Sequence, residues 1–324
     1  DIQHQQVQIS QGNLQYRASS NTWRFAENQW DIIGETNSNI SQSYNDWIDL
    51  FGWGTSGWNN GNVYYQPYDY EYLTDLNNGH EYGPTNGTNH YFNLTNEFAN
   101  SDWGINNPII NGGNTSHYWR TLTNAEWIYV FNTRTTTSGI RYAKAQVNGT
   151  DGVILVPDDW IVSTFSLNKT NKTDANYNSN IINDLVWRNT FEPAGAVFLP
   201  AAGNRNGTSV YHIGGTGYYW SSSVDSSHGA HMVNFANNNL YPGDAGSRYF
   251  GLSVRLVHST QNNNDNHIEV TTNNVTDITQ TTAVCGGNVT ITGNGMVTAR
   301  GVCWSTNSNP TVNDNHTSNG TGTS

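Results

Sequence analysis

Two apolar runs decide the fold: Tyr218-Tyr219-Trp220-Ser221-Ser222-Ser223 and Gly251-Leu252-Ser253-Val254-Arg255-Leu256-Val257. Aromatic and β-branched residues are enriched in strands, so both runs predict core strands. The residues between them, Val224 to Phe250, are rich in Ser, Asn, His, Gly, Tyr and Asp and contain no Trp, Lys, Glu or Gln. This middle segment is too polar to form a hydrophobic core and too rich in aromatic residues to be a simple linker. The pattern predicts two rigid strands that hold a less regular segment.

The middle segment has the composition of a recognition surface. Tyr supplies large amphipathic contact area, and Ser, Gly and Asn supply adaptable hydrogen bonds. We therefore expect a binding protein whose specificity lies in residues 224–250. Tyr241, Tyr249 and Phe250 are expected to face the ligand because they flank Pro242 to Ser247, which has the composition of an exposed loop.

Length and charge limit the class of protein. The chain has 324 residues, enough for one large domain and a small one. Only 12% of its residues are charged, the formal net charge is -12, and no basic run occurs. This excludes a nucleic-acid binder, because phosphate contacts need clustered Lys and Arg. The mean hydropathy is -0.64, and no apolar run approaches membrane-spanning length. We expect an extracellular protein of a cell or virion surface, without membrane insertion by this chain.

Alternating and periodic patterns predict the elements of the large domain. The clearest helix is expected over Trp119–Arg134, where Thr123 and Glu126 have the spacing of a capping box. A weaker helix is expected over Ile181–Arg188. Strands are expected at Gln6–Ser10, Asn13–Ala18, Thr22–Ala26, Gly152–Val156 and Ala196–Leu199.

Aromatic-rich segments between these elements predict packed loops. Glycines beside large rings in Leu50–Gly57 indicate backbone that passes close over aromatic side chains. Residues 59–114 are expected to be loops packed on the domain. Trp103 and Trp119 are expected in the core. For Trp47 and Trp58, core and surface platform remain open.

The C-terminal part predicts a second, smaller module. Residues 258–267 form a polar linker, and strands are expected at Ile268–Thr272, Ala283–Ile291 and Val297–Trp304. Cys285 and Cys303 each lie in an alternating run, so we expect them on neighbouring strands, able to form a disulfide. The module should be less stable than the large domain, because a sandwich of this kind needs about seven strands.

Several runs together resemble a known family. Trp220-Ser221-Ser222-Ser223 and the closing run Gly251–Val257 resemble the end of the C-type-lectin-like domain of variable proteins diversified by retroelements. Framework-like runs extend the resemblance over most of residues 1–257: Gly12–Tyr16, Phe51–Gly54, Trp119–Trp127 and Phe198–Gly203. The resemblance implies an α+β C-type-lectin-like domain with short strands and a pair of helices over residues 1–257.

The tail resembles a different family. Thr282–Gly287 and Arg300–Trp304 resemble immunoglobulin-like repeats of bacterial surface proteins. This implies a partial β-sandwich over residues 268–324.

The family resemblance also implies how the binding segment varies. An error-prone reverse transcriptase changes adenines in such segments, mostly in AAC codons, which never become Trp, Lys, Glu, Gln or Met codons. The composition of residues 224–250 fits this origin, except for Met232. The implied function is that of a receptor or adhesin, of a bacterium or phage, for a protein or glycan on another cell or phage surface.

The family pattern implies which positions vary and bind ligand. Asn237 to Asn239 are expected to form a fixed turn. The side chains expected to point inward are those of Trp220, Val233, Phe235, Leu240 and Val254. The diversified positions are Val224, Asp225, His228, Gly229, His231, Met232, Asn234, Ala236, Tyr241, Gly243, Asp244, Ala245, Gly246, Ser247, Tyr249 and Phe250.

Two other binding or structural functions remain open. A glycan-binding lectin-like protein without diversification would bind free sugars even after changes in residues 224–250. A structural module of a surface fibre or pilus tip would bind no ligand.

An enzyme is the third alternative, and we do not expect one. The helix motif and the ending Val254–Val257 are similar to formylglycine-generating enzymes, which act through their own cysteines, but residues 1–257 contain none. Asp158-Asp159 is expected in a turn, and Ser221–Ser223 lacks the context of a catalytic serine.

Metal ions and cofactors are likewise not expected. The histidines lack zinc-site spacing, and Glu192-Pro193-Ala194 lacks the carboxamide of calcium-binding lectins. Some carboxylate and amide groups are close enough in sequence to bind an ion, although solvated surface positions are the expectation: Asp69, Glu71, Asp75, Asn264 and Asp265.

Overall fold

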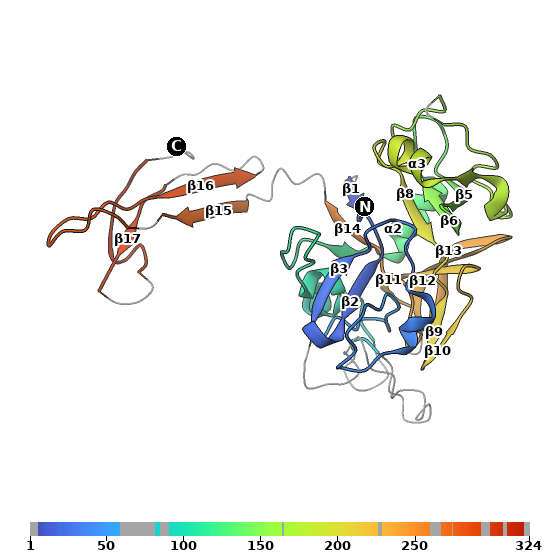
Figure 1. The fold of residues 1–324 in the computed structure, drawn as a ribbon, viewed down its shortest axis with the longest axis horizontal. Helices are drawn as coiled ribbons and strands as arrows, with labels where there is room; N and C mark the ends of the chain where they lie inside the picture. The colour runs from blue at the N-terminus through green and yellow to red at the C-terminus, as the bar shows by residue number, and fades with distance from the viewer. Residues whose placement is uncertain are drawn as a thin grey trace. The chain divides into compact units, whose positions relative to one another are not determined.

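The computed structural model describes residues 6–58, 82–84, 91–163, 165–225, 229–259, 267–273, 275–292, 299–306 and 310–320. The chain divides into two compact units, residues 8–258 and residues 259–324, and Figure 1 draws both. The first unit combines several small sheets with short helices, which is an α+β architecture. No helix among the described residues has the length and apolar character needed to span a bilayer.

The predicted N-terminal strands are confirmed. The strand β1 (Val7–Ile9) lies beside β14 (Leu256–Ser259), which also pairs with β4 (Arg120–Thr121). The strands β2 (Leu14–Arg17) and β3 (Thr22–Phe25) form an antiparallel hairpin. The two ends of the large unit therefore meet in one sheet.

The predicted helix is shorter than expected at its start. The helix α2 (Asn124–Ile128) continues into the π-helical turn η6 (Tyr129–Thr133), and the capping box of Thr123 and Glu126 is present. Its expected first residues instead form β4, because Arg120 folds back and binds both carboxylate oxygens of Glu126, at 2.7 and 2.9 Å. One carboxylate thus caps the helix and fixes the strand before it.

A second sheet confirms the two buried strands predicted around residues 152 and 196. It contains β5 (Tyr142–Val147), β6 (Thr150–Leu155), β7 (Ile181–Ile182) and β8 (Val197–Pro200) in the order β7-β5-β6-β8. The weaker predicted helix is only partly right, because Ile181 and Ile182 pair with β5 as strand β7.

The helical part of that segment begins only after this strand. Asn183 caps the short helix α3 (Asp184–Val186), which continues into the π-helical turn η8 (Trp187–Phe191). A local polar cap, rather than the apolar spacing, decides where the chain changes from strand to helix.

The segment expected to be irregular forms a three-stranded sheet, although its register shifts between Trp220 and Val224 and between Met232 and Asn234. The strands β11 (Thr216–Val224), β12 (Gly229–Ala236) and β13 (Asn239–Ser247) pair antiparallel in that order. Pro242–Ser247 was expected to be an exposed loop, and this prediction is wrong. These residues lie in β13, an edge strand, where Pro and Gly are tolerated because one side of the strand needs no ladder hydrogen bonds.

The second apolar run lies in the core but forms less regular strand than predicted. Leu252 makes an isolated bridge with Phe51 and Ser253 with Tyr219, and β14 begins only at Leu256. The smaller elements of the large unit are η1 (Ala18–Ser20), η2 (Gly34–Ser38), η5 (Asn96–Ser101), α1 (Trp103–Asn106), η7 (Tyr177–Ser179), β9 (Asn204–Asn206) and β10 (Ser209–Tyr211).

Tryptophan side chains hold the sheet of β11 to the core. The indole nitrogen of Trp53 donates to the Ser221 carbonyl at 2.8 Å, and that of Trp220 donates to the Phe51 carbonyl at 2.8 Å. Trp103 and Trp119 are buried, as predicted.

The prediction that glycine backbone passes over rings is confirmed at Gly52. A Cβ atom on this residue would lie 2.4 Å from the ring of Tyr82. Of the predicted loop region 59–114, residues 59–81 and 85–90 lie outside the described part of the chain.

The second unit contains two small antiparallel sheets among its described residues. The strand β15 (His267–Thr272) pairs with β16 (Gly287–Thr292), and β17 (Cys303–Trp304) pairs with β18 (Asn315–His316). The strand predicted at Ile268–Thr272 is confirmed as β15. The strand predicted at Ala283–Ile291 begins four residues later, as β16. Of the strand predicted at Val297–Trp304, the described residues form strand only at its end, as β17. The immunoglobulin-like character of this unit stays a prediction.

The predicted disulfide is not present. Cys285 and Cys303 are both free thiols. Cys285 precedes β16 and lies outside any strand, whereas Cys303 pairs with His316 of β18. The prediction of neighbouring strands is therefore wrong, because the strand expected from residue 283 starts only at Gly287.

Candidate binding face

The register of the three strands brings polar and aromatic side chains together. Tyr218 of β11 lies opposite Asn234 of β12, and Asn234 lies opposite Tyr241 of β13. Residues directly opposite on adjacent strands share one face of a sheet. Tyr241 is 55% exposed, and the other two are half-buried. The row forms a partly open face, which we call the binding face together with the accessible predicted variable positions around it.

The residues expected to point inward are buried. Trp220, Val233, Phe235 and Val254 are 0% exposed, and Leu240 is 3% exposed. They contribute to the packing that fixes the strands, so truncating one is expected to destabilise the domain. The prediction that these five side chains are buried is therefore confirmed.

Most of the described positions predicted to vary are accessible. Asp225, Tyr241, Gly243 and Ala245 are exposed. The half-buried ones are Val224, His231, Asn234, Ala236, Asp244, Gly246, Ser247, Tyr249 and Phe250. His228 lies outside the described residues.

Two predicted positions are buried, which corrects their assignment as ligand contacts. Gly229 and Met232 are covered, and Met232 belongs to the hydrophobic core cluster with Trp220. Met232 is also the residue that does not fit an AAC codon, so burial and codon origin agree. Phe250, although half-buried, packs partly against the same cluster and against Tyr249, with ring centroids 4.7 Å apart.

Hydrogen bonds and charge organise the accessible side chains. One carboxylate oxygen of Asp244 accepts from the Asn234 amide at 2.9 Å, and the other accepts from the Ala245 backbone at 2.9 Å. Burial raises the pKa of the Tyr218 hydroxyl, and the negative charge of Asp244 raises it further. Tyr218 therefore stays protonated, able to donate a hydrogen bond. His231 lies 3.5 Å from Asp225.

Cations are scarce on this sheet. Among residues 216–225 and 229–250, Arg248 is the sole Arg or Lys. It is 0% exposed, and its guanidinium lies 3.0 Å from the ring centroid of Tyr91. The face therefore presents carboxylate, amide and aromatic groups.

Residues 91–94 border the same sheet. The backbone of Val224 donates to the Asn93 side chain at 2.9 Å, and the backbone of Leu94 donates to the Ser222 carbonyl at 2.9 Å. Together with the contact between Tyr91 and Arg248, these bonds attach the described end of the long loop region to β11 and to the end of β13. Residues 91–94 of the predicted loop region therefore adjoin the segment that is predicted to vary.

Sequence reasoning missed Tyr218 because it lies in a run that predicts a core strand. Alternation along the strand gives no signal for it, because Tyr218 and the fully buried Trp220 are two residues apart and share one face of the sheet. The turn expected at Asn237–Asn239 lies where it was predicted, at the junction of β12 and β13, and Asn239 is the first residue of β13.

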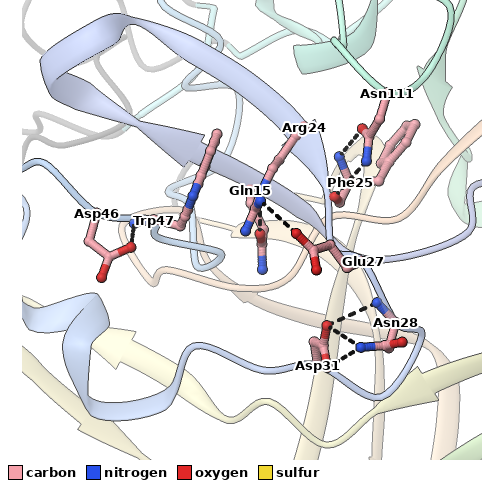
Figure 2. A network of polar contacts seen from close by, with 9 residues as sticks. All are labelled: Gln15, Arg24, Phe25, Glu27, Asn28, Asp31, Asp46, Trp47 and Asn111. Carbon is pink, nitrogen blue, oxygen red and sulfur yellow. Dashed lines mark hydrogen bonds and ion pairs between the residues drawn. The ribbon is translucent and has the colours of Figure 1, made fainter.

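A second polar cluster, on β2 and β3, is closed by its own contacts (Figure 2). Arg24 donates to Gln15 at 2.9 Å and pairs with Glu27 at 3.3 Å. Its guanidinium lies 4.0 Å from the ring centroid of Trp47, and that of Arg17 lies 4.3 Å from it. Trp47 is 7% exposed, so it is a covered residue and not an open platform. Trp58 is half-buried.

Two of the candidate catalytic groups, Ser223 and Asp158, make structural contacts. The Ser223 hydroxyl accepts from the backbone of Asn124 at 3.0 Å, and Ser221 and Ser222 are buried. Asp158 and Asp159 lie in a turn, as predicted, and Asp158 pairs with Arg134 at 3.1 Å.

Potential metal ligands do not cluster in the part of the chain that the structure describes. In the described ranges, no group of three His, Cys, Asp or Glu side chains could hold a metal ion. The carboxylate and amide groups considered for an ion lie outside those ranges: Asp69, Glu71, Asp75, Asn264 and Asp265.

Comparison with known proteins adds no relative. No protein family, curated protein or solved structure matches this chain.

Proposed function

We propose that this chain is an extracellular receptor or adhesin that binds its ligand through the binding face, and that a retroelement diversifies this face on a C-type-lectin-like scaffold. The observation that carries the proposal is the separation of roles along β12 and β13. The described positions expected to vary are accessible except for Gly229 and Met232, whereas Val233, Phe235 and Leu240, which lie between them, are core residues. Truncating a large core side chain costs about 2–5 kcal/mol, whereas surface changes usually stay within about 0.5 kcal/mol.

The chemistry of the face narrows the ligand. Asp225 and Asp244 give it negative character, Tyr218 and Tyr241 supply amphipathic rings, and the only described cation of the sheet is buried. The whole chain also carries a formal net charge of -12. Juxtaposed like charges disfavour association, so a neutral or basic protein or glycan surface is the favoured partner.

A matched pair of displayed libraries tests the proposal on the protein itself. The first randomises Asp225, Tyr241, Asp244 and Ala245 with AAC-derived codons. The control randomises four core positions, Val233, Phe235, Leu240 and Val254, with the same codons. Resistance to protease reports folding. Most members of the first library should fold and most of the control should not, and equal survival would reject the division of roles.

Binding is then selected from the folded members of the first library. Hen lysozyme, a basic protein, and an array of free glycans serve as probes. Binders to lysozyme should arise with sequences that differ at the randomised positions. Glycan affinity that is unchanged across the library would instead favour the undiversified lectin, and the absence of any binder would favour a structural module.

The coding sequence gives an independent test of diversification. The source DNA should contain a near-copy of the region that encodes residues 217–257, with adenines at the variable codons, beside a reverse transcriptase gene. A genome without such a copy would leave a binding face that is not diversified.

A further inference from the structure

Lys144 is buried below the turn that joins β12 and β13. The chain has lysines at only three positions, and Lys169 and Lys172 are exposed whereas Lys144 is 0% exposed. Lys144 lies in β5, between two buried alanines. A lysine is almost never fully buried unless its ammonium group has partners.

The ammonium group of Lys144 is surrounded by backbone carbonyl oxygens. It donates to the carbonyls of Ala236 at 2.6 Å, Thr173 at 2.7 Å, Asn239 at 2.8 Å and Asn237 at 3.3 Å. Three of these four carbonyls belong to the turn between β12 and β13. Figure 1 shows β5 and β13 in neighbouring parts of the large unit.

The same turn has further fixed contacts. The backbone of Tyr177 donates to the Asn237 side chain at 3.0 Å, and the backbone of Ala236 donates to the Asn239 side chain at 3.1 Å. The ring of Tyr177 also lies 6.0 Å from the Lys144 ammonium. The turn is thus attached to β5 and to η7, which contain none of the positions predicted to vary.

Burying this charge is not in itself favourable. Burial lowers the pKa of Lys144 to about 8, although the negative charge of Asp174 opposes the shift. Replacing a buried charge by an apolar side chain is often neutral or stabilising in other proteins. Here, however, it would leave several carbonyls without their donor, which carries a penalty of its own. The three N–H groups of an ammonium match this set of acceptors, and an apolar side chain has none.

We propose that Lys144 is the positioning residue of the binding face, whose ammonium group holds the β12–β13 turn at one geometry while the side chains of the face vary. Its acceptors are backbone carbonyls, so the contact does not depend on which side chain occupies Ala236, a position predicted to vary. We call the contact between the Lys144 ammonium group and the turn carbonyls the clamp. That the clamp serves ligand binding rests on the proposed function, whereas the existence of the clamp does not.

Chemical rescue tests the clamp directly. In the full chain, Lys144→Ala removes the part of the side chain that n-propylammonium can replace. The carbonyl ¹³C chemical shifts of Ala236, Asn237 and Asn239 should change in the variant, and the melting temperature should fall. Adding n-propylammonium should restore both in a saturable manner, and propan-1-ol, which has the same length without the charge, should not. Lys172→Ala is the matched control and should change neither.

A pH titration of the unmodified protein covers the case in which Lys144→Ala does not fold. The three carbonyl shifts should titrate together with a midpoint near 8, because the neutral amine has one donor fewer. The facing groups are Asp174 and the Tyr177 ring, and Asp174→Asn should move the midpoint lower. Rescue by propan-1-ol as effective as by n-propylammonium, or turn carbonyls that do not titrate, would overturn the proposal. Neither readout uses a ligand, so failure of the clamp and failure of the binding function are separate results.

Discussion

At the scale of single residues, two buried carboxyl groups make stability depend on pH. Asp49 is 0% exposed, and its oxygens accept from the Asn37 amide at 2.8 Å and the Ile33 backbone at 3.1 Å. Burial raises the pKa of Asp49 from 3.8 to about 6, and burial also raises that of Asp102 to about 6. The folded protein therefore holds these protons at a pH at which the unfolded chain has released them.

The Asp49→Asn variant tests this linkage. A group whose pKa is raised by folding stabilises the protein fully below 3.8, and this contribution is lost as the pH rises through about 6. The wild-type protein should therefore gain stability relative to Asp49→Asn between about pH 7 and about pH 4, by up to about 3 kcal/mol. Urea unfolding at both pH values measures the difference. Exposed Asp159→Asn serves as the control, and a constant gap between wild type and Asp49→Asn would contradict the expectation.

Trp220 and Tyr241 should respond oppositely to truncation. Trp220 is 0% exposed and its indole nitrogen donates to the Phe51 carbonyl at 2.8 Å, so Trp220→Ala should cost about 3–5 kcal/mol and leave that carbonyl with the Leu252 backbone as its remaining donor. Tyr241 is 55% exposed, so Tyr241→Ala should change the stability by less than about 0.5 kcal/mol. Thermal unfolding of both variants measures this, and equal losses would show that the two positions do not differ in role.

At the scale of elements, local signals were readable from the sequence and distant ones were not. The capping box of α2 was predicted because Thr123 and Glu126 are close in sequence and act on each other's backbone. The strands β12 and β13 were missed because irregular register between Met232 and Asn234 breaks the alternation, and Pro242 and Gly243 have turn composition. The role of Lys144 could not be predicted from the sequence, because the carbonyls that accept from its ammonium group lie 29 to 95 residues away along the chain.

Within β13 and the residues after it, the structure separates positions that were all predicted from the sequence to contact ligand. Tyr241 and Asp244 lie on the binding face, whereas Phe250 packs against the core cluster. Replacing Tyr241 and Asp244 together should lower the melting temperature by less than about 2 °C, and Phe250→Ala should lower the melting temperature by more than that. Differential scanning calorimetry of both variants checks this. A larger loss from the Tyr241 and Asp244 pair would mean that the face contributes to the core.

At the scale of the whole molecule, the two units differ in how much they bury. The large unit encloses side chains such as Trp53 and Trp127 at 0% exposure. In the second unit, no described residue from 270 to 320 whose exposure is known is buried, and Val270, Ile278 and Val284 are 64%, 72% and 57% exposed. Stability follows buried apolar surface, so the second unit should open at a lower free energy than the first.

Limited proteolysis of the full chain measures this difference. Thermolysin cleaves beside exposed aliphatic residues, so it should cut first near Val270, Ile278 or Val284 and leave a resistant fragment that retains β14. Because β14 pairs with β4 and its Leu256 carbonyl accepts from Ser10 at 2.8 Å, that fragment should keep the melting temperature of the large unit. Free thiols at Cys285 and Cys303 mean that a reductant should not change the rate of the first cut. Equal rates of loss for both units would show that the second unit has a core which the exposures of its described residues do not reveal.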